Sequence, residues 1–131
     1  MQVPIDLVYT WVDGSDPEHF RLRQSFSQNP QDLNPERYRD PHQLLRYSLR
    51  SVERFAPWIG QIFLLTQRPQ RPEWLQLQHP RVRLLHHDEI FEDTSVLPVF
   101  NSHPIESYLH RVPTASDYFL YLNDDMLFAR P

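Results

Sequence analysis

The segment Tyr118-Phe-Leu-Tyr-Leu-Asn-Asp-Asp125 gives the clearest indication of fold class, because a nearly continuous apolar run is followed at once by polar and acidic residues. Apolar runs of this kind are typical of strands that are buried on both faces, as in a parallel sheet. In open parallel sheets, ligands bind at the carboxyl ends of the strands. The segment therefore predicts an α/β domain with a candidate site at its acidic end.

Three other apolar runs are predicted to be strands of the same sheet. They cover residues 5–12, 62–66 and 82–85, and a short fifth strand is predicted at residues 126–128. Helical patterns predict helices over residues 18–26, from residue 40 to the residue before Pro57, and from residue 102 to the residue before Pro113. This order of elements is typical of a three-layer α/β domain, and we expect one such domain over residues 1–131.

The helix that begins near residue 40 has a predicted start and a predicted buried face. Asp40 is expected as its N-cap, with Pro41 in the first turn and Gln43 closing a capping box. Helical spacing places four apolar side chains on one face: Leu45, Leu49, Val52 and Phe55. Arginines occupy another face, where Arg46 and Arg50 either bind phosphate or simply face the solvent.

Composition excludes several classes of protein. The absence of cysteine excludes disulfides, thiolate metal sites and a cysteine nucleophile. Two glycines are too few for either of the usual Gly-rich phosphate-binding motifs. A formal net charge of −4 argues against a nucleic-acid-binding protein. Because the chain shows no signal peptide and no apolar run of ~20 residues, we expect a cytoplasmic protein.

The two adjacent carboxylates of Asp124 and Asp125 are the sharpest signal of chemistry. They repel each other at the end of a predicted buried strand, and a divalent cation, Mg²⁺ or Mn²⁺, relieves the repulsion by bridging them to a diphosphate. Asparagine and aspartate are also favoured turn residues, so a structural turn with no role in chemistry would have the same sequence. Spacing alone does not choose between the two.

The first predicted strand also ends in an acidic segment, Asp13-Gly14-Ser15-Asp16. This sequence is typical of a structural turn, while its place after a strand also suits a ligand site. Trp11, just before it, either belongs to the core or forms a stacking wall for a base or a sugar.

The predicted helix near residue 102 carries a second candidate. Glu106 and His110 are four residues apart, so Glu106 can orient His110 as an acid–base group, although an ordinary helix pair has the same spacing. Ser107 and Arg111 are spaced in the same way. His86, His87 and Asp88 suggest a metal site only weakly, because neighbouring strand residues point to opposite faces.

Several segments, taken in order, resemble the signature blocks of one family. Ile5-Asp-Leu-Val-Tyr-Thr-Trp-Val-Asp-Gly-Ser-Asp16 closely resembles the first block of the Stealth proteins. Leu45-Arg-Tyr-Ser-Leu-Arg-Ser51, Pro72-Glu-Trp-Leu75 and Tyr121-Leu-Asn-Asp-Asp125 are similar to parts of their second block. The family's third and fourth blocks have no counterpart in these residues.

The family includes bacterial capsular polysaccharide phosphotransferases and the lysosomal-enzyme N-acetylglucosamine-1-phosphotransferase. The resemblance implies transfer of a sugar-1-phosphate from a nucleotide-diphosphate sugar to an acceptor saccharide hydroxyl, typically with a divalent metal. It also implies a Rossmann-like fold of the nucleotide-diphospho-sugar-transferase type, with a mostly parallel sheet that is incomplete in this chain.

The residues and the resemblance together lead to three assignments. Catalysis is assigned to Asp13, His110 and Arg111, with either Asp13 or His110 as the base. Donor binding is assigned to Trp11, Gly14, Arg46 and Asn123. The metal is assigned to Asp124 and Asp125. The expected partners are the donor, the saccharide acceptor and a membrane-bound polysaccharide assembly complex, at whose periphery the protein would lie.

Two rival functions fit the same residues. A glycosyltransferase proper attacks the anomeric carbon of the donor and releases a nucleoside diphosphate. A binding module holds the nucleotide sugar without turning it over.

Overall fold

A four-stranded parallel sheet forms the centre of the fold. The computed structural model describes residues 3–26, 42–75, 79–100 and 102–131. The strands are β1 (Ile5–Thr10), β2 (Ile59–Thr66), β3 (Val82–His86) and β4 (Tyr118–Asn123), in the order β3-β2-β1-β4. Every neighbouring pair is parallel, which confirms the predicted α/β class.

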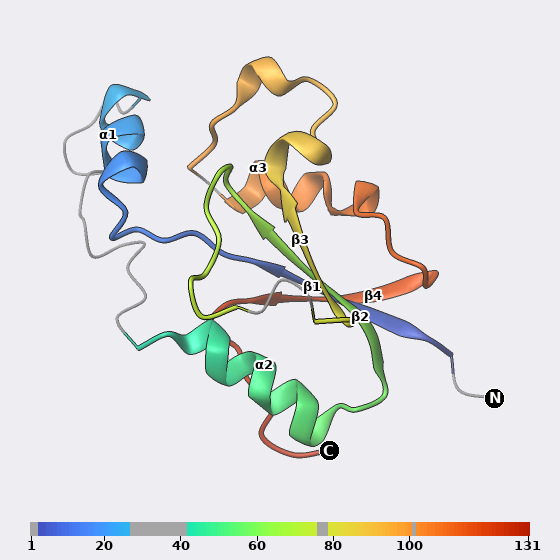
Figure 1. Ribbon diagram of the computed structural model, residues 1–131. Coiled ribbons are helices and arrows are strands. Elements are labelled where there is room, and N and C mark those ends of the chain that lie inside the picture. Colours follow the sequence, from blue (N-terminus) through green and yellow to red (C-terminus); the bar gives the residue numbers. More distant parts are fainter. Residues whose placement is uncertain (1–2, 27–41, 76–78, 101) are drawn as a thin grey trace.

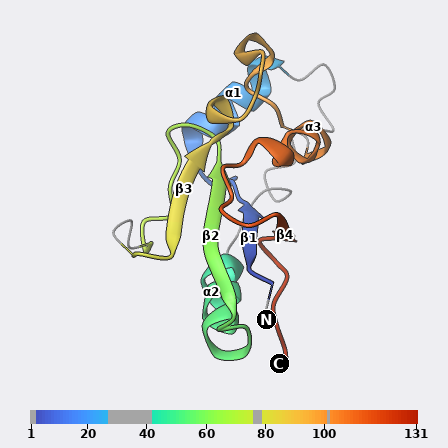
Figure 2. The same cartoon turned by 90° about the vertical axis from the view of Figure 1, so that its right-hand side faces the viewer.

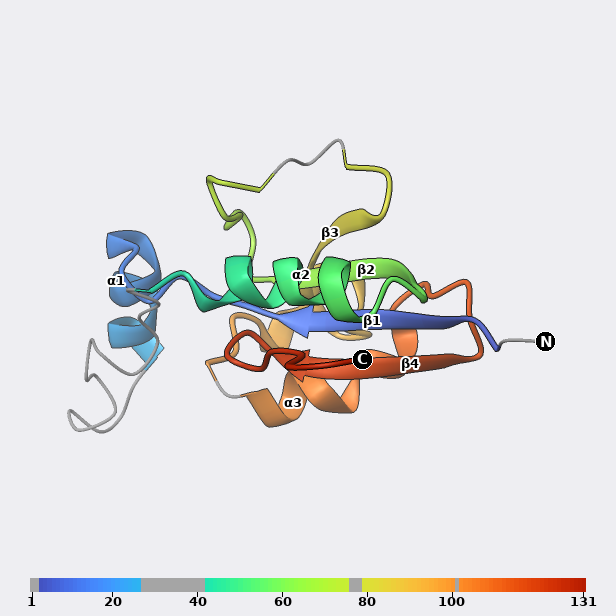
Figure 3. The same cartoon turned by 90° about the horizontal axis from the view of Figure 1, so that it is seen from below.

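Helices cover both faces of the sheet (Figures 1 and 3). Helix α2 (Leu44–Phe55) packs on one face, and α3 (Ser102–Ser107) packs on the other. Side-chain alternation along β1 explains this arrangement, because Leu7 belongs to the core on the α2 face and Val8 to the core on the α3 face. In the described part of the chain, no helix has the length and apolarity needed to cross a membrane.

Helix α1 (Pro17–Phe26) lies beyond the carboxyl ends of the strands, as Figures 1 and 2 show. Its start is set by Asp16, whose Oδ1 accepts a hydrogen bond from the Glu18 amide at 3.0 Å. Pro17 suits the first helical position, because its missing N–H has no partner to lose there. The helix predicted over residues 18–26 is thereby confirmed.

The buried face of α2 agrees with the prediction in part. Leu45 and Val52 are buried as expected, and Arg50 and Arg54 on the arginine face are exposed. Leu49 and Phe55 were also predicted to be buried, but the structure leaves both of them half-buried.

The predicted start of α2 is wrong at Gln43. This residue is the N-cap, with a left-handed φ of 51° and no side-chain capping bond, so it precedes the helix and closes no capping box. Asp40 and Pro41 lie outside the described residues.

A buried carboxylate joins the amino ends of three strands. Asp6, which is 2% exposed, accepts hydrogen bonds from the amides of Gln61 at 2.8 Å, Ala115 at 2.9 Å and Ser116 at 3.2 Å. A Cβ added at Gly60 would lie 2.6 Å from Asp6 Oδ1, so the close approach of β2 to this carboxylate requires glycine. These bonds fix the register of β1 relative to β2 and β4.

The polypeptide after α3 departs from the predictions. The predicted continuous helix ends at Ser107 and continues as a 3₁₀ turn, η5 (Leu109–Arg111), before β4. Residues 126–128 form no strand, contrary to prediction. They lie along α2 instead, where Ser48 Oγ donates to the Met126 carbonyl at 2.5 Å and the Phe128 amide donates to Ser51 Oγ at 3.0 Å.

Strands β2 and β4 were both predicted to be buried on two faces. Strand β2 confirms this, since residues 62–66 are all buried. Strand β4 does not, because it lies at the edge of the described sheet and Tyr118 is 65% exposed. The apolar run identified a strand correctly but not its place in the sheet.

Candidate functional site

The two acidic segments lie at the same edge of the sheet. Strands β1 and β4 are parallel neighbours, and Thr10 at the end of β1 is paired with Asn123 at the end of β4. Asp13 follows β1 by three residues, and Asp124 and Asp125 follow β4 directly. The predicted placement of all three aspartates at the carboxyl edge is therefore confirmed.

A structural turn holds Asp13 at this edge. Its Oδ1 accepts hydrogen bonds from the Ser15 amide at 2.9 Å and from Ser15 Oγ at 2.5 Å. The Asp16 amide donates to the Asp13 carbonyl at 3.3 Å and closes the turn, in which Gly14 is buried. The turn predicted from the sequence is confirmed, and it fixes the Asp13 carboxylate in one orientation.

Gln70, which no sequence pattern indicated, ties this turn to the end of the neighbouring strand β2. The side chain is 8% exposed, accepts from the Asp13 amide at 3.0 Å, and donates through Nε2 to the Asp13 carbonyl at 3.0 Å and to Asp16 Oδ2 at 3.0 Å. Thr66 Oγ1, at the end of β2, donates to the Gln70 carbonyl at 2.9 Å. A contact between residues this far apart leaves no local signal in the sequence.

The second acidic segment is also a turn. The Met126 amide donates to the Asn123 carbonyl at 3.2 Å, which reverses the chain after β4. The Tyr121 hydroxyl can donate to Asn123 Oδ1 at 2.8 Å and accept from Thr10 Oγ1 at 3.0 Å, so it ties the ends of β1 and β4 together. Asp124 is half-buried and Asp125 is exposed.

These residues fit a divalent cation only as part of its ligand set. Within residues 3–26, 42–75, 79–100 and 102–131, no three His, Asp or Glu side chains gather closely enough to hold a metal by themselves. Mg²⁺ normally takes one or two protein carboxylates and completes its octahedron with water and substrate phosphates. Asp124 and Asp125 can supply those carboxylates, and a bound diphosphate would have to supply further oxygens.

A pocket of about 230 Å³ lies over the ends of β2 and β3. Gln67 follows β2, and His87 begins the 3₁₀ turn η3 (His87–Glu89) after β3. Both side chains are buried, and neither Gln67 Oε1 nor His87 Nδ1 has a hydrogen-bond partner among the described residues. Leu22, Leu97 and Pro98 supply an apolar lining.

The pocket has the chemistry to hold a flat polar ring. Burial, assisted by the neighbouring His86, lowers the pKa of His87 from 6.5 to about 4, so its imidazole is neutral near neutral pH. Gln67 and His87 thus line the pocket with two neutral polar side chains between apolar surfaces. At the rim, Arg68 pairs with Asp88 through N–O distances of 2.6 and 2.9 Å.

Replacing His87 with glutamine is expected to flatten the pH dependence of stability. The folded-state pKa of His87 is depressed, so its neutral form stabilises the fold fully above about pH 6.5, and this stability is lost as the pH falls toward about 4. Between about pH 7 and pH 5 the loss through His87 should be about 2 kcal/mol. Urea unfolding of the parent and of His87→Gln at both pH values measures it.

His110→Gln is the matched control for this measurement, because His110 is exposed. It should keep the parental pH dependence. An equal pH dependence in His87→Gln and in the parent would show that His87 is not the buried neutral group described above.

The remaining predicted site residues lie elsewhere. Trp11 belongs to the core on the α2 face, which was one of its two interpretations. His110 and Arg111 are exposed in η5, which leads to the start of β4 and thus toward the amino edge (Figure 1). Glu106 Oε1 lies 3.3 Å from the Tyr121 hydroxyl, and no hydrogen bond in the described residues joins Glu106 to His110.

Strand order arranges the site groups in a line along the carboxyl edge. The pocket lies over β3 and β2, the Asp13 turn follows β1, and the Asp124–Asp125 turn follows β4. Neighbouring strands are ~4.8 Å apart, so the line from β3 to β4 is ~14 Å long. An extended ligand would match this order if it had a flat ring at one end and, toward the other end, anionic groups whose charge a bound cation neutralises.

A parallel α/β sheet with polar turns along its carboxyl edge defines the class of open α/β proteins that bind ligands at this edge. The chain matches two conserved regions of one protein family, "Stealth protein CR1, conserved region 1" over residues 3–30 and "Stealth protein CR2, conserved region 2" over residues 37–131. The chain therefore belongs to the Stealth family, as the resemblance in the sequence indicated.

Similar curated proteins occur in several actinobacteria. One exopolysaccharide phosphotransferase of Streptomyces coelicolor is 49% identical over 130 residues, which cover 97% of this chain and 21% of that protein. Exopolysaccharide phosphotransferase CpsY of Mycobacterium leprae is 47% identical over 97% of this chain and 24% of its own length. A Nocardia farcinica exopolysaccharide phosphotransferase is 47% identical, with 25% of its length covered. The chain thus spans about a quarter or less of these relatives.

Proposed function

We propose that this chain forms the donor-binding part of a transferase that moves a sugar-1-phosphate from a nucleotide-diphosphate sugar to a saccharide hydroxyl. The observation that carries the proposal is the line of groups along the carboxyl edge, from the Gln67–His87 pocket through Asp13 to Asp124 and Asp125. The names of the relatives support phosphoryl chemistry on exopolysaccharides. The predicted cytoplasmic location and assembly complex belong to the same proposal.

In this proposal the nucleotide base lies in the pocket over β2 and β3. Uracil presents an N–H donor between two carbonyl acceptors, which suits the neutral amide of Gln67 and the neutral imidazole of His87 that line the pocket. The diphosphate then extends past the Asp13 turn toward Asp124 and Asp125. A divalent cation there would neutralise the phosphate charge.

The reaction is an in-line displacement at the phosphorus that carries the sugar. The acceptor hydroxyl oxygen forms a bond to this β-phosphorus while the bond to the oxygen of the α-phosphate breaks, and the nucleoside monophosphate leaves. The Asp13 carboxylate takes the hydroxyl proton. Asp13 is preferred to His110 as the base because Gln70 and Ser15 hold it at the carboxyl edge, whereas His110 is exposed in η5.

The products of the reaction test the proposal. Incubation with a uridine-diphosphate sugar, a saccharide acceptor and Mg²⁺ should yield uridine monophosphate and a phosphodiester that contains one donor phosphorus. Phosphorus NMR of the mixture distinguishes this product from a glycoside. Release of uridine diphosphate would support a glycosyltransferase proper, and donor binding without either product would support a binding module.

A further inference from the structure

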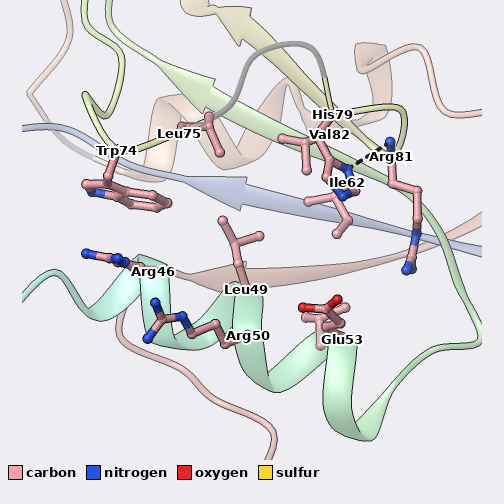
Figure 4. A pocket seen from close by; sticks show the side chains of 11 residues that line it. Arg46, Leu49, Arg50, Glu53, Ile62, Trp74, Leu75, His79, Arg81 and Val82 are labelled. Carbon is pink, nitrogen blue, oxygen red and sulfur yellow. Dashed lines mark hydrogen bonds between the residues drawn. The ribbon is translucent and has the colours of Figure 1, made fainter.

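A second hollow lies on the face of the sheet, between α2 and the segment that joins β2 to β3. Its volume is about 330 Å³, and Figure 4 shows the side chains around it. Leu49, Ile62 and Val82 make an apolar floor. We call this hollow the α2 groove. None of the roles assigned above uses it as a whole.

The two ends of the α2 groove carry different charges. At one end, Arg46 lies beneath the indole of Trp74, and Arg50 extends from α2 toward the same end (Figure 4). At the other end stand Glu53 and Arg81. The strands drawn in Figure 4 point toward the Trp74 end, so the basic end of the groove faces the carboxyl edge of the sheet.

The two arginines of the basic end are available for a ligand, whereas Arg81 is not. Arg81 donates to the carbonyls of Ile59 at 2.6 Å and Gly60 at 3.3 Å, so it holds the wall of the groove in place. Arg46 and Arg50 are exposed, and in the described part of the chain neither forms an ion pair with a carboxylate. Arg46 donates to Gln43 Oε1 at 3.4 Å, and the guanidinium of Arg50 lies 5.6 Å from the centre of the Tyr47 ring, so neither cation is neutralised.

The sequence of groups along the α2 groove matches a sugar phosphate. Guanidinium groups bind phosphate through paired hydrogen bonds, and the flat indole of Trp74 suits the apolar face of a sugar ring. The Glu53 carboxylate accepts hydrogen bonds from sugar hydroxyls. Arg46 and Glu53 are seven residues apart on one helix, which is a rise of ~10 Å, comparable with the length of one sugar phosphate.

We propose that the α2 groove binds a sugar phosphate unit of the acceptor, with its phosphate between Arg46 and Arg50 and its sugar on Trp74. This inference rests on the proposed function, because a transferase that builds a polymer of repeated phosphodiesters extends a chain whose previous linkage is itself a phosphodiester. In the proposed function the donor lies along the carboxyl edge of the sheet, which leaves the groove for the acceptor.

Calorimetric titration of glucose 1-phosphate into the chain tests the groove. The chain should bind this probe, and Arg46→Glu and Arg50→Glu should each weaken binding by about tenfold or more, since each reverses a charge beside the phosphate. Arg54→Glu is the matched control, because it makes the same change at an exposed position of the same helix outside the groove. It should bind like the parent. Equal losses in all three variants, or no binding by the parent, would overturn the proposal.

Further probes separate the possible sources of binding. Inorganic phosphate and neutral methyl glucoside should each bind at least about tenfold more weakly than glucose 1-phosphate. Phosphate lacks the contact of the sugar with Trp74, and methyl glucoside lacks the contacts of the phosphate with Arg46 and Arg50. Trp74→Phe keeps an aromatic wall, so its fold should persist and its affinity should fall less than that of Arg50→Glu. Equal affinity for phosphate alone, or competition by uridine monophosphate, would overturn the proposal in favour of a plain anion site or a donor site.

Two outcomes keep this inference distinct from the proposed function. Binding in the α2 groove should be the same with Mg²⁺ and with a chelator, and it should be unchanged in Asp124→Asn. Release of uridine diphosphate in the product analysis would contradict the proposed reaction. It would not affect the test of the groove, which depends on the affinities of the Arg46, Arg50 and Arg54 variants for glucose 1-phosphate.

Discussion

Replacing Asp124 or Asp125 with asparagine is expected to weaken the binding of a uridine-diphosphate sugar in the presence of Mg²⁺ and to change it little in a chelator. Two carboxylates and a diphosphate are all negative, so they bind each other poorly without a cation. The loss should be at least about tenfold, because even groups behind the metal ligands typically change metal affinity by ~10–100-fold. Calorimetric titration of the donor into the parent and into each variant, with Mg²⁺ and with chelator, gives the affinities to compare.

Asp117→Asn is the matched control for these two variants. Asp117 is exposed and immediately precedes β4, so it lies at the amino ends of the strands, away from the site. Its substitution makes the same change of charge. It should bind donor like the parent. Donor binding that is equal with metal and with chelator, and unchanged in Asp124→Asn and Asp125→Asn, would remove the metal from the mechanism.

Leu45→Ala is expected to destabilise the chain by ~2–5 kcal/mol, the usual range for a fully buried leucine. Leu45 is 0% exposed and belongs to the core between α2 and the sheet, together with Leu7 and Tyr9. Removing its side chain leaves a cavity that the rigid sheet cannot fill. Chemical denaturation at a fixed pH measures the change in the free energy of unfolding.

Leu49→Ala provides the internal comparison, because it makes the same chemical change one turn later in α2. Leu49 is half-buried and lines the α2 groove, so its loss should be clearly smaller than that of Leu45. The helix propensity changes equally in both variants, and the difference between them therefore reports burial. Equal losses at the two positions would contradict the orientation of α2.

The strands and their shared edge were predictable because each depends on local patterns. An apolar run followed by acidic residues identifies a strand and its carboxyl end, and parallel strands bring those ends together whatever their order. The register Thr10 to Asn123 then places Asp13 and Asp124 at one edge. Sequence periodicity also identified the buried positions Leu45 and Val52 of α2.

Local preference did not decide the structure at three places, and at residues 126–128 tertiary contacts override it. The residues around Gln43 are typical of a capping box, yet the backbone of Gln43 adopts a left-handed conformation before the helix. Residues 126–128 have an apolar sequence typical of a strand, yet hydrogen bonds with Ser48 and Ser51 attach them to α2. The i, i+4 pair of Glu106 and His110 assumed a helix that ends at Ser107.

The parts of the site that sequence reasoning missed are neutral side chains. Gln67 and Gln70 carry no charge and occur in a segment with no recognisable motif, while His87 was considered only as a metal ligand. Their importance comes from burial, from the bonds of Gln70 to Asp13 and Asp16, and from Gln67 Oε1 and His87 Nδ1, which have no hydrogen-bond partner within the described part of the chain. Only the three-dimensional arrangement makes these properties visible.

The edge position of β4 also governs how the chain behaves in solution. Its six residues, Tyr-Phe-Leu-Tyr-Leu-Asn, include no proline and no charge, whereas β3 at the other edge carries the exposed Arg83. Charged residues and prolines are the usual means by which edge strands avoid pairing with other molecules, and short uncharged runs of this composition favour aggregation. Unless another polypeptide segment covers β4, concentrated solutions of the chain should tend toward edge-to-edge assembly, and protein concentration becomes a variable in every titration described above.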